Sequence, residues 1–438
     1  MKIIILTPGA GGMYCGNCLR DNALVHSLRE SGHDVTMVPL YLPLTLDEPD
    51  ESAKVPIFYS GINVYLDQKL PWFGNSPTWV RNTLSRRGLL RLAAGKAGST
   101  RPSELGEMTI SMLKGGEGHQ SRDMQDLLAW LKGQPSPDLI CLSNALLLGM
   151  AAGLKAAFPV PLLCFLQGED SFLDALSEPY KSEAWQLLTR ISRTVDQFIS
   201  PSHYFAGLMI RRLDLDRAKV AVVPNGIRLD GYPPVAGDPP ALDASSAPVI
   251  GYFARQCRDK GLDILVEAFI RLNERGRVQG CRLKIGGSCA PTDKPFLDLL
   301  RHRLGERNLL GQVTFHPNID RNAKIQFLHS LTLFSVPARY GEAFGLYLVE
   351  ALASGVPIVQ PRTAAFTEFV EASGAGSLFQ PEDADSLASA LETLLLDHPK
   401  RLVLRQNGLR AAHGCYSATI MANRIVEVFQ SLISRRPS

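Results

Sequence analysis

The chain has no apolar run long enough to span a membrane and no excess of charge of either sign. A membrane-spanning helix needs about 20 consecutive apolar residues, and the apolar run near the start, Ile3 to Leu6, is also too short for a secretory signal peptide. A net charge of +3 on 438 residues gives no electrostatic reason to expect nucleic acid as a partner. We therefore expect a cytoplasmic protein that does not bind nucleic acid.

The cysteines fit neither a disulfide framework nor a zinc site. Cys141 and Cys164 stand inside apolar, strand-like runs, which is typical of reduced thiols in a protein core. No group of His and Cys residues has zinc-binding spacing, so we expect no metal site. Cys15 and Cys18 form an isolated Cys-x-x-Cys. Two interpretations stay open for it: packing beside a ligand-binding loop, or redox or metal duty in which a helix N-terminus lowers a thiol pKa.

Two common nucleotide-binding fingerprints are also missing. The glycine-rich stretch Pro8 to Gly12 follows the first apolar run, but Tyr14 stands where the third glycine of a dinucleotide fingerprint belongs. No Gly-Lys-Ser/Thr follows either, which excludes a Walker A loop. The glycines still allow a sharp turn and a close approach of the backbone to a ligand. We expect a ligand-binding loop of another kind there.

Short apolar runs of strand length alternate with amphipathic helical stretches, and this alternation occurs twice. It predicts an α/β protein with two doubly wound parallel sheets whose carboxyl edges bind ligand. A proline-rich stretch near 231–248 cannot pack as a helix or a central strand, so we place the domain boundary there. The predicted parts are a first domain at 1–230, a linker at 231–248, a second domain at 249–415 and a C-terminal helix at 416–438.

Glu342 and Glu350 are two carboxylates separated by seven residues; Glu350 lies on a predicted helix that ends near Gly355, and Glu342 lies in the turn before it. Eight helical steps rise by roughly 12 Å, which is comparable to the span from the ribose of a nucleotide to a sugar on its diphosphate. Between the two acids, the N–H groups of Ala343 to Leu346 at the helix N-terminus can bind diphosphate oxygens. This spacing predicts a nucleotide-sugar site.

In their order and intervals, these motifs resemble the GT-B glycosyltransferases, and specifically glycosyltransferase family 4, across nearly the whole chain. The resemblance rests on the acid-x7-acid motif, the loop Pro8 to Gly12, the segment Val222 to Ile227, and Arg255 with Lys260. It implies two Rossmann-like domains facing across a cleft, with the C-terminal helix packing back on the first. It also implies a retaining enzyme that moves a sugar from a nucleoside-diphosphate sugar to a hydroxyl of a glycan, lipid or small molecule, with no metal and no further cofactor.

The charge of such a donor indicates the residue roles. Negative charge grows on the leaving diphosphate oxygen, where Arg255 and Lys260 supply fixed cations; the alternative is a pair of solvated loop charges. The resemblance places Glu350 on the ribose hydroxyls and Glu342 beside the donor sugar, with a helix N-cap acid as the alternative for Glu342. Gln167 stands where the family often carries a histidine. It can hydrogen-bond a sugar hydroxyl but cannot act as a base.

Further positions complete the predicted site. Glu169 or Asp170 takes the acceptor proton, unless both are solvated loop acids. Gly287 lies in the expected turn after the second strand of the second domain, and His316 lies beside the nucleotide base or is a structural histidine. The predicted catalytic residues are Glu342, Arg255, Lys260 and Gln167, and the predicted donor-binding residues are Gly11, Gly12, Gly287, His316, Ala343, Phe344, Gly345, Leu346 and Glu350.

The segment Trp79 to Arg101 contains six basic residues and no acid, interleaved with leucines. It predicts peripheral contact with the inner face of an anionic membrane, or a hold on a lipid-linked or phosphorylated acceptor; a solvated helix face is the alternative. Two other classes of function stay open. One is a nucleotide-sugar epimerase or phosphorylase of the same architecture, and the other is a non-catalytic sugar-binding or redox-sensing relative that uses Cys15 and Cys18.

Overall fold

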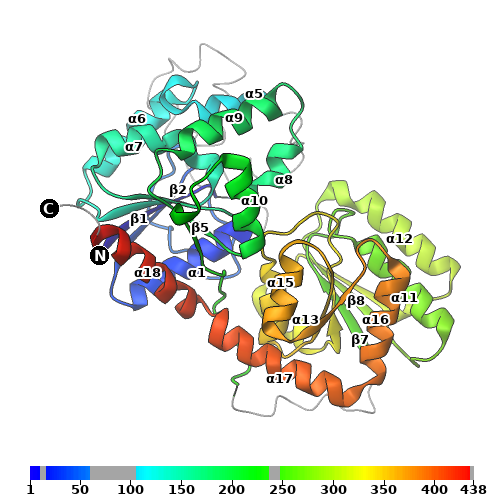
Figure 1. Cartoon of the computed structure of the whole chain (residues 1–438). Coiled ribbons are helices and arrows are strands. Elements are labelled where there is room, and N and C mark those ends of the chain that lie inside the picture. The colour runs from blue at the N-terminus through cyan, green and yellow to red at the C-terminus, as the bar shows by residue number, and fades with distance from the viewer. Residues whose placement is uncertain (10–15, 60–104, 236–246, 435–438) are drawn as a thin grey trace. The chain divides into compact units, whose positions relative to one another are not determined.

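A computed structural model describes residues 1–9, 16–59, 105–235 and 247–434 (Figure 1). Its contacts divide the chain into two compact units. The first is Met1–Pro224 together with the described part of Met421–Ser438, and the second is Asn225–Ile420. The sequence-based domain limits, 1–230, 231–248, 249–415 and 416–438, stay a prediction.

The first unit is built on a six-stranded parallel sheet in the order β2-β1-β3-β4-β5-β6. Strands β1, β3, β4 and β5 are almost wholly buried, because helices cover both faces of the sheet. This burial explains why they are continuous apolar runs in the sequence. The strands are β1 (Lys2–Thr7), β2 (Asp34–Pro39), β3 (Leu139–Leu142), β4 (Leu162–Phe165), β5 (Gln197–Ser200) and β6 (Val220–Val222).

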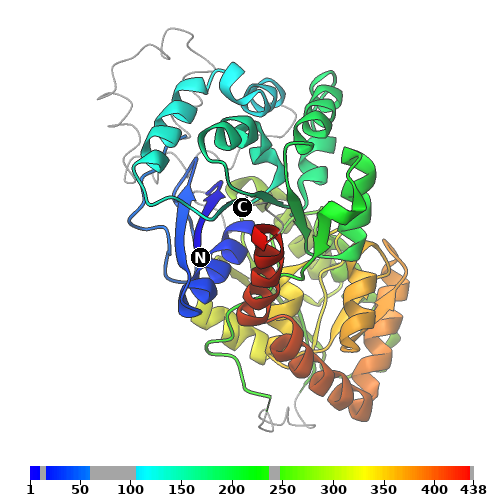
Figure 2. The same ribbon diagram turned by 60° about the vertical axis from the view of Figure 1, so that its left-hand side comes forward.

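The helices of the first unit lie in two layers. Figures 1 and 2 show α5, α6, α7 and α9 on one side of the sheet and α1 and α18 on the other. The helices are α1 (Gly16–Glu30), α5 (Gly106–Leu113), α6 (Ser121–Lys132), α7 (Ala151–Ala157), α8 (Glu169–Asp174), α9 (Tyr180–Ser192), α10 (His203–Leu213) and α18 (Ala418–Ser434), with short 3-10 turns η3 (Gly115–Glu117), η4 (Ala145–Met150) and η5 (Arg217–Lys219). On α18 the buried residues Met421, Ala422, Ile425 and Phe429 follow the three-to-four spacing of one helix face.

The second unit repeats this architecture. Its parallel sheet has the order β12-β11-β10-β7-β8-β9. The strands are β7 (Val249–Phe253), β8 (Arg282–Gly287), β9 (Val313–Pro317), β10 (Leu333–Phe334), β11 (Ile358–Pro361) and β12 (Gly376–Phe379). The helices are α11 (Leu262–Arg275), α12 (Lys294–Glu306), α13 (Arg321–His329), α14 (Leu346–Ala353), α15 (Ala364–Ser373), α16 (Ala384–Leu396) and α17 (His398–Cys415), with turns η6 (Pro291–Asp293) and η7 (Leu310–Gln312).

Helix α11 shows how the second core forms. It begins after Gly261 and ends at Gly276, and both glycines have positive φ, a backbone conformation that a side chain would strain. Its buried face includes Leu265, Phe269 and Leu272, which are fully covered. Burial of each such side chain contributes about 1.5–3 kcal/mol relative to exposure. The short loop before α11 is thereby held at the carboxyl edge of β7.

The predicted fold class is confirmed: the described residues form two doubly wound parallel α/β sheets. Two strands do not coincide with their apolar runs. The run Leu333 to Val336 forms only the two-residue strand β10, and β11 continues past the apolar Val359 to Pro361. Apolar runs continue into the loops at the carboxyl edge because those loops are buried too, so periodicity alone does not locate strand ends.

Candidate functional site

The loops at the carboxyl edge of the second sheet bring the predicted donor residues together. Arg255 and Lys260 follow β7, and Glu342 lies in the loop between β10 and α14. The backbone N–H of Arg339 donates to the carbonyl of Asp259 at 3.0 Å, which joins these two loops. Parallel α/β sheets bind ligands at this edge. The residues that the motifs singled out are therefore neighbours in space.

Lys260 and Glu342 form an ion pair that is 18% and 14% exposed. Two tyrosines complete it: the Tyr340 and Tyr347 hydroxyls donate to Glu342 Oε1 at 3.2 and 3.1 Å. Lys260 Nζ contacts the same oxygen and lies 4.8 and 5.6 Å from the centres of the two rings. Gly261 permits this approach, because a Cβ there would lie 1.8 Å from the Pro337 carbonyl oxygen. Neither charge is a solvated loop charge.

The alternative that Glu342 caps a helix is wrong. Helix α14 begins at Leu346, its N-cap is Gly345 with a φ of 91°, and no side chain caps it. Glu342 therefore precedes the helix, and only the second half of the stretch from Glu342 to Glu350 is helical. The 12 Å rise assumed helix throughout and does not apply. Of the four predicted donor-binding N–H positions, only Leu346 is helical, and the Phe344 ring packs in the core against Phe369.

Arg255 is held by a buried carboxylate that the sequence did not indicate. Its guanidinium donates to both oxygens of Asp293, from Nη2 at 2.9 Å and from Nε at 3.2 Å. Asp293 is 7% exposed and Arg255 is 48% exposed, so the arginine is anchored on one side and reaches solvent on the other. The hydrogen bonds that Arg255 donates to Asp293 raise the pKa of Arg255 above its usual value. This two-point grip orients the guanidinium for a phosphate.

Glu350 on α14 pairs with a lysine that we did not predict. Lys324 Nζ on α13 lies 2.6 Å from Glu350 Oε1, and the side chains are 7% and 13% exposed. Lys324 belongs to the buried face of α13 with Ile325, Phe327 and Leu328. A lysine in a buried helical stripe needs a carboxylate partner. The position of Lys324 in this apolar stripe was therefore the sequence feature that could have indicated a buried ion pair.

Gly287 and His316 lie on neighbouring strands. Gly287 is the last residue of β8 rather than part of the following turn; its φ is 110°, and a Cβ would lie 2.0 Å from the Ala254 carbonyl oxygen. His316 on β9 contacts Thr314 Oγ1 at 3.0 Å and packs edge-on against Phe327 with ring centres 5.4 Å apart. Partial burial, and then Lys284, lower the pKa of His316. These contacts fit the structural interpretation of His316.

In the first unit, Gln167 follows β4, and its backbone is fixed by Glu169. Glu169 is 4% exposed, and its two oxygens accept from the Ala145 and Gln167 N–H groups at 2.8 and 2.9 Å. Burial raises its pKa against these hydrogen bonds. The interpretation of Glu169 as a solvated acid is therefore wrong, and both of its oxygens are engaged. Asp170 is half-buried, its pKa is also raised by burial, and its Oδ1 has no hydrogen-bond partner in the part of the chain that the structure describes.

The sequence analysis also did not predict a buried polar cluster at the carboxyl edge of the first sheet. Arg20 on α1 is 1% exposed, lies 4.0 Å from the centre of the Phe165 ring and donates to the Ser143 carbonyl at 3.0 Å. Its neighbour Asp21 accepts from the hydroxyls of Thr7, at 2.7 Å, and Ser143. The ends of β1, β3 and β4 are thereby tied to α1. Two consecutive charged residues, Arg20 and Asp21, within a predicted helix that follows the first strand were the sequence feature that could have indicated this cluster.

Several predicted positions lie outside the described residues: Gly11, Gly12, Cys15 and Trp79 to Arg101. Cys18 is fully buried on α1, and the thiols of Cys141, Cys164, Cys257, Cys281, Cys289 and Cys415 are free. Within 1–9, 16–59, 105–235 and 247–434, no three or more His, Cys, Asp or Glu side chains gather in a way that could hold a metal ion. None of the helices in these ranges is long and apolar enough to cross a membrane.

The chain contains two Asp-x-Asp sequences, at 214–216 and 383–385, a pattern that can hold a divalent cation. In both, a carboxylate caps a helix. Asp216 accepts from the Ala218 N–H before η5, and Asp383 accepts from the N–H groups of Asp385 and Ser386 at the start of α16. Helix capping accounts for both of these carboxylates.

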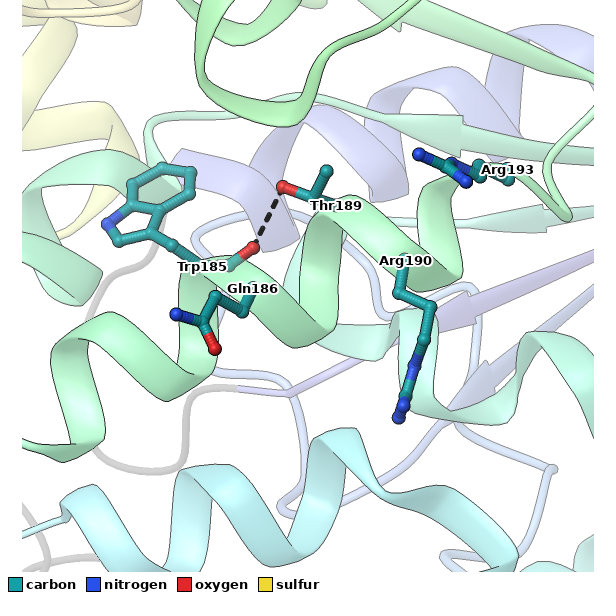
Figure 3. A pocket seen from close by; sticks show the side chains of 5 residues that line it. All are labelled: Trp185, Gln186, Thr189, Arg190 and Arg193. Atoms are coloured by element: carbon teal, nitrogen blue, oxygen red, sulfur yellow. Dashed lines mark hydrogen bonds between the residues drawn. The ribbon is translucent and has the colours of Figure 1, made fainter.

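A pocket of about 440 Å³ opens elsewhere, on α9 of the first unit. Figure 3 shows its lining, which comes from that helix and its C-cap residue Arg193: Trp185, Gln186, Thr189, Arg190 and Arg193. The Thr189 hydroxyl donates to the Trp185 carbonyl at 2.9 Å. None of the predicted site residues lines this pocket.

Two doubly wound sheets, with paired cations and two glutamates at the carboxyl edge of the second, define the class of GT-B proteins. The chain belongs to glycosyltransferase family 4. The family described as "Glycosyltransferase Family 4" matches residues 110–230, and "Glycosyl transferases group 1" matches residues 240–411. The predicted family is thus confirmed, and with it the glycosyltransferase class.

Curated relatives match part of the chain. A D-inositol 3-phosphate glycosyltransferase of Xylanimonas cellulosilytica is 29% identical over 253 residues, which cover 56% of this chain and 58% of that protein. The lipopolysaccharide core biosynthesis mannosyltransferase LpsB of Rhizobium meliloti is 28% identical over 250 residues, covering 51% of this chain and 68% of that protein. The chain thus spans little more than half the length of the first of these relatives.

Solved structures match the fold over nearly the full length. Anabaena HepE in complex with UDP has a TM-score of 0.68 at 17% identity, covering 99% of this chain and 100% of that one. The sucrose-phosphate synthase of Thermosynechococcus elongatus has a TM-score of 0.68 at 20% identity, with the same coverage. At these identities the likeness establishes the fold alone.

Proposed function

We propose that the protein is a retaining glycosyltransferase that moves a sugar from a UDP-sugar to a hydroxyl group. The observation that carries this proposal is the constellation at the carboxyl edge of the second sheet. There, Arg255 and Lys260 present cations, while Glu342 and Glu350 bracket the same helix start. Each charge is already oriented by a fixed partner.

In this reaction the bond between the anomeric carbon and the diphosphate oxygen breaks, and its electron pair goes to that oxygen. Arg255 and Lys260 stabilise the growing charge. Glu350 accepts from the ribose hydroxyls, and Glu342 stabilises positive charge on the sugar. The acceptor oxygen then bonds to the anomeric carbon on the face that the diphosphate leaves, which retains the configuration. Of the two acids after Gln167, Asp170 is the candidate for the acceptor proton, because the oxygens of Glu169 are engaged.

The donor and acceptor follow from the relatives by analogy. UDP and UDP-glucose are the ligands named with the Anabaena HepE structures, which supports a UDP-sugar. D-inositol 3-phosphate and the lipopolysaccharide core are named with the curated relatives. They support an acceptor that carries hydroxyl groups beside anionic groups, in free or lipid-linked form.

Binding tests the donor first. A thermal-shift series with UDP, GDP and ADP should give the largest rise in melting temperature with UDP, because a ligand that binds only the folded state stabilises it by mass action. Comparison with 2′-deoxy-UDP tests Glu350: Glu350→Gln should weaken UDP more than 2′-deoxy-UDP. An equal loss for both ligands would contradict the ribose contact.

Turnover tests the reaction. UDP release from UDP-glucose, with and without inositol 3-phosphate, should depend on the acceptor. Arg255→Met and Lys260→Met should each lower kcat about 10²- to 10³-fold, the range for loss of a group that stabilises developing charge. If neutral replacements at Arg255, Lys260, Glu342 and Glu350 all left turnover unchanged, the proposal would be wrong. NMR of the product decides the configuration, and inversion would refute retention.

The two other classes make distinct predictions. An epimerase would interconvert UDP-sugars without releasing UDP, and a phosphorylase would need phosphate in place of a hydroxyl acceptor. Neither has a specific observation in its favour. For location, we propose a cytoplasmic protein that meets its acceptor at a membrane through the basic segment 79–101. Flotation with anionic liposomes tests this, and the absence of salt-sensitive binding would remove it.

A further inference from the structure

Two tyrosines surround the carboxylate of Glu342. Tyr340 lies two residues before it in the loop, and Tyr347 is the second residue of α14. Both hydroxyls donate to one oxygen, Oε1, at 3.2 and 3.1 Å, and Lys260 Nζ binds that same oxygen. The other oxygen, Oε2, has no hydrogen-bond partner among the residues that the structure describes. All three donors thus converge on one side of the carboxylate.

The two phenols are permanent donors. Burial, followed by the charge of Glu342, raises the pKa of Tyr340 well above its usual value, and the same causes raise that of Tyr347. Both hydroxyls are therefore protonated at any working pH. Lys260 differs, because the proposed function also assigns its ammonium to the donor diphosphate. A diphosphate that attracts Lys260 would remove one of the three donors from Glu342.

We propose that Tyr340 and Tyr347 are positioning residues: they hold Glu342 by Oε1 and present Oε2 to the donor sugar while Lys260 turns to the diphosphate. This inference rests on the proposed function. A carboxylate that kept only Lys260 as its partner would either retain the lysine or lose its orientation when the lysine left. With two phenols in place, Glu342 keeps its orientation after Lys260 has moved. Neither tyrosine needs to touch the substrate.

The test removes the hydroxyls and keeps the rings. Tyr340→Phe, Tyr347→Phe and the double variant are compared in UDP release from UDP-glucose and in UDP affinity. We expect kcat to fall about 10-fold in each single variant, which corresponds to about 1.4 kcal/mol, and further in the double variant. The Kd for UDP should change by less than about twofold, because UDP lacks the sugar that Glu342 meets. A melting curve verifies that each variant is folded.

A matched control uses another buried tyrosine. The Tyr59 hydroxyl donates to Met124 Sδ at 3.1 Å in the first unit. Tyr59→Phe removes a buried hydroxyl of the same kind and should leave kcat and UDP affinity unchanged. A general sensitivity of the fold to such losses would instead lower the activity of all the variants together.

The split between kcat and UDP affinity separates positioning from packing. A general loss of packing would lower both, whereas a loss of positioning lowers kcat alone. The inference is overturned if the double variant keeps the wild-type kcat, or if UDP affinity falls as much as kcat. Failure of the proposed function looks different: the wild-type protein would then neither bind UDP nor release it from UDP-glucose.

Discussion

Replacing Lys324 by methionine tests the buried pair that holds Glu350. The two side chains are 7% and 13% exposed and their charged atoms lie 2.6 Å apart, so Lys324→Met leaves a carboxylate with little water and no cation. Breaking a buried pair in this way costs about 3–5 kcal/mol. Arg362→Met is the control, because Arg362 and Glu371 are 59% and 62% exposed and 3.4 Å apart. Loss of such a surface pair costs about 1 kcal/mol or less.

The tryptophans allow each unit to be followed separately. All four occur within the first 185 residues, at positions 72, 79, 130 and 185, and therefore in the first unit. Tryptophan fluorescence during urea titration reports that unit, whereas far-UV circular dichroism reports both. We expect Lys324→Met to lower the urea midpoint of the second unit's transition, which is seen only by circular dichroism. The first unit's transition, which is seen by fluorescence, should keep its midpoint. Separate analysis is needed because a two-unit chain need not unfold in one step.

A double variant completes the cycle. Lys324→Met with Glu350→Gln leaves no bare charge, so its cost should be smaller than that of Lys324→Met alone. The reasoning fails if Lys324→Met lowers the free energy of unfolding by no more than Arg362→Met does. It also fails if the loss in the double variant equals the sum of the losses measured for Lys324→Met and Glu350→Gln separately. Either result would mean that the two side chains do not depend on each other for burial.

Three further outcomes are expected. Asp170→Asn should lower kcat about 10²-fold or more with UDP affinity unchanged, as loss of a general base does; an unchanged kcat would exclude that role. Arg339 donates to both oxygens of Asp263, at 2.7 and 2.9 Å, and to the Arg258 carbonyl at 2.6 Å, and thereby fixes the loop that carries Lys260. Lysine cannot make these two parallel bonds to Asp263, so Arg339→Lys should raise the KM for UDP-glucose. A wild-type KM would contradict this. Burial lowers the pKa of His316 and His329 from 6.5, so the unfolded second unit binds more protons as pH falls through about 6.5, and its stability should decline from about pH 7 to pH 5. Urea titrations of His316→Gln/His329→Gln should show a flatter pH dependence, and an equally steep one would exclude these groups.

The sheets could be predicted from the sequence because strands buried on both faces are continuous apolar runs, as Leu139–Leu142 and Leu162–Phe165 are. Arg255, Lys260, Glu342 and Glu350 could be found because each belongs to a short motif: the first three lie in strand-to-helix loops and Glu350 lies on the helix that follows. Their partners could not. Asp293 is 38 residues from Arg255 in the chain, and Lys324 is 26 residues from Glu350.

Such pairings are set by which loops meet at a sheet edge, and no local period records them. The aromatic partners were missed for a different reason. Tyr340 lies just before the acid motif and Tyr347 lies within it. In the sequence both are typical of core aromatic residues, and the Tyr347 ring does pack beside Phe334. Only the atoms that their hydroxyls reach reveal the role. The same applies to Glu169. Its polar neighbours in the sequence suggest a solvent-exposed loop, but its carboxylate accepts hydrogen bonds from two backbone N–H groups.

In the proposed reaction, the pairing of the predicted donor-site charges has a consequence for catalysis. Arg255 with Asp293, Lys260 with Glu342 and Lys324 with Glu350 sum to zero net charge, so each of these cations already has a fixed carboxylate partner. On that proposal, a donor diphosphate competes with Asp293 and Glu342 for Arg255 and Lys260, which limits the affinity of the ground state. As the bond to the sugar breaks, negative charge grows on the leaving oxygen, and the two cations are attracted more strongly to that oxygen than to their carboxylate partners. The proposed mechanism therefore has Arg255 and Lys260 bind the transition state more strongly than the donor, and only that difference accelerates the reaction.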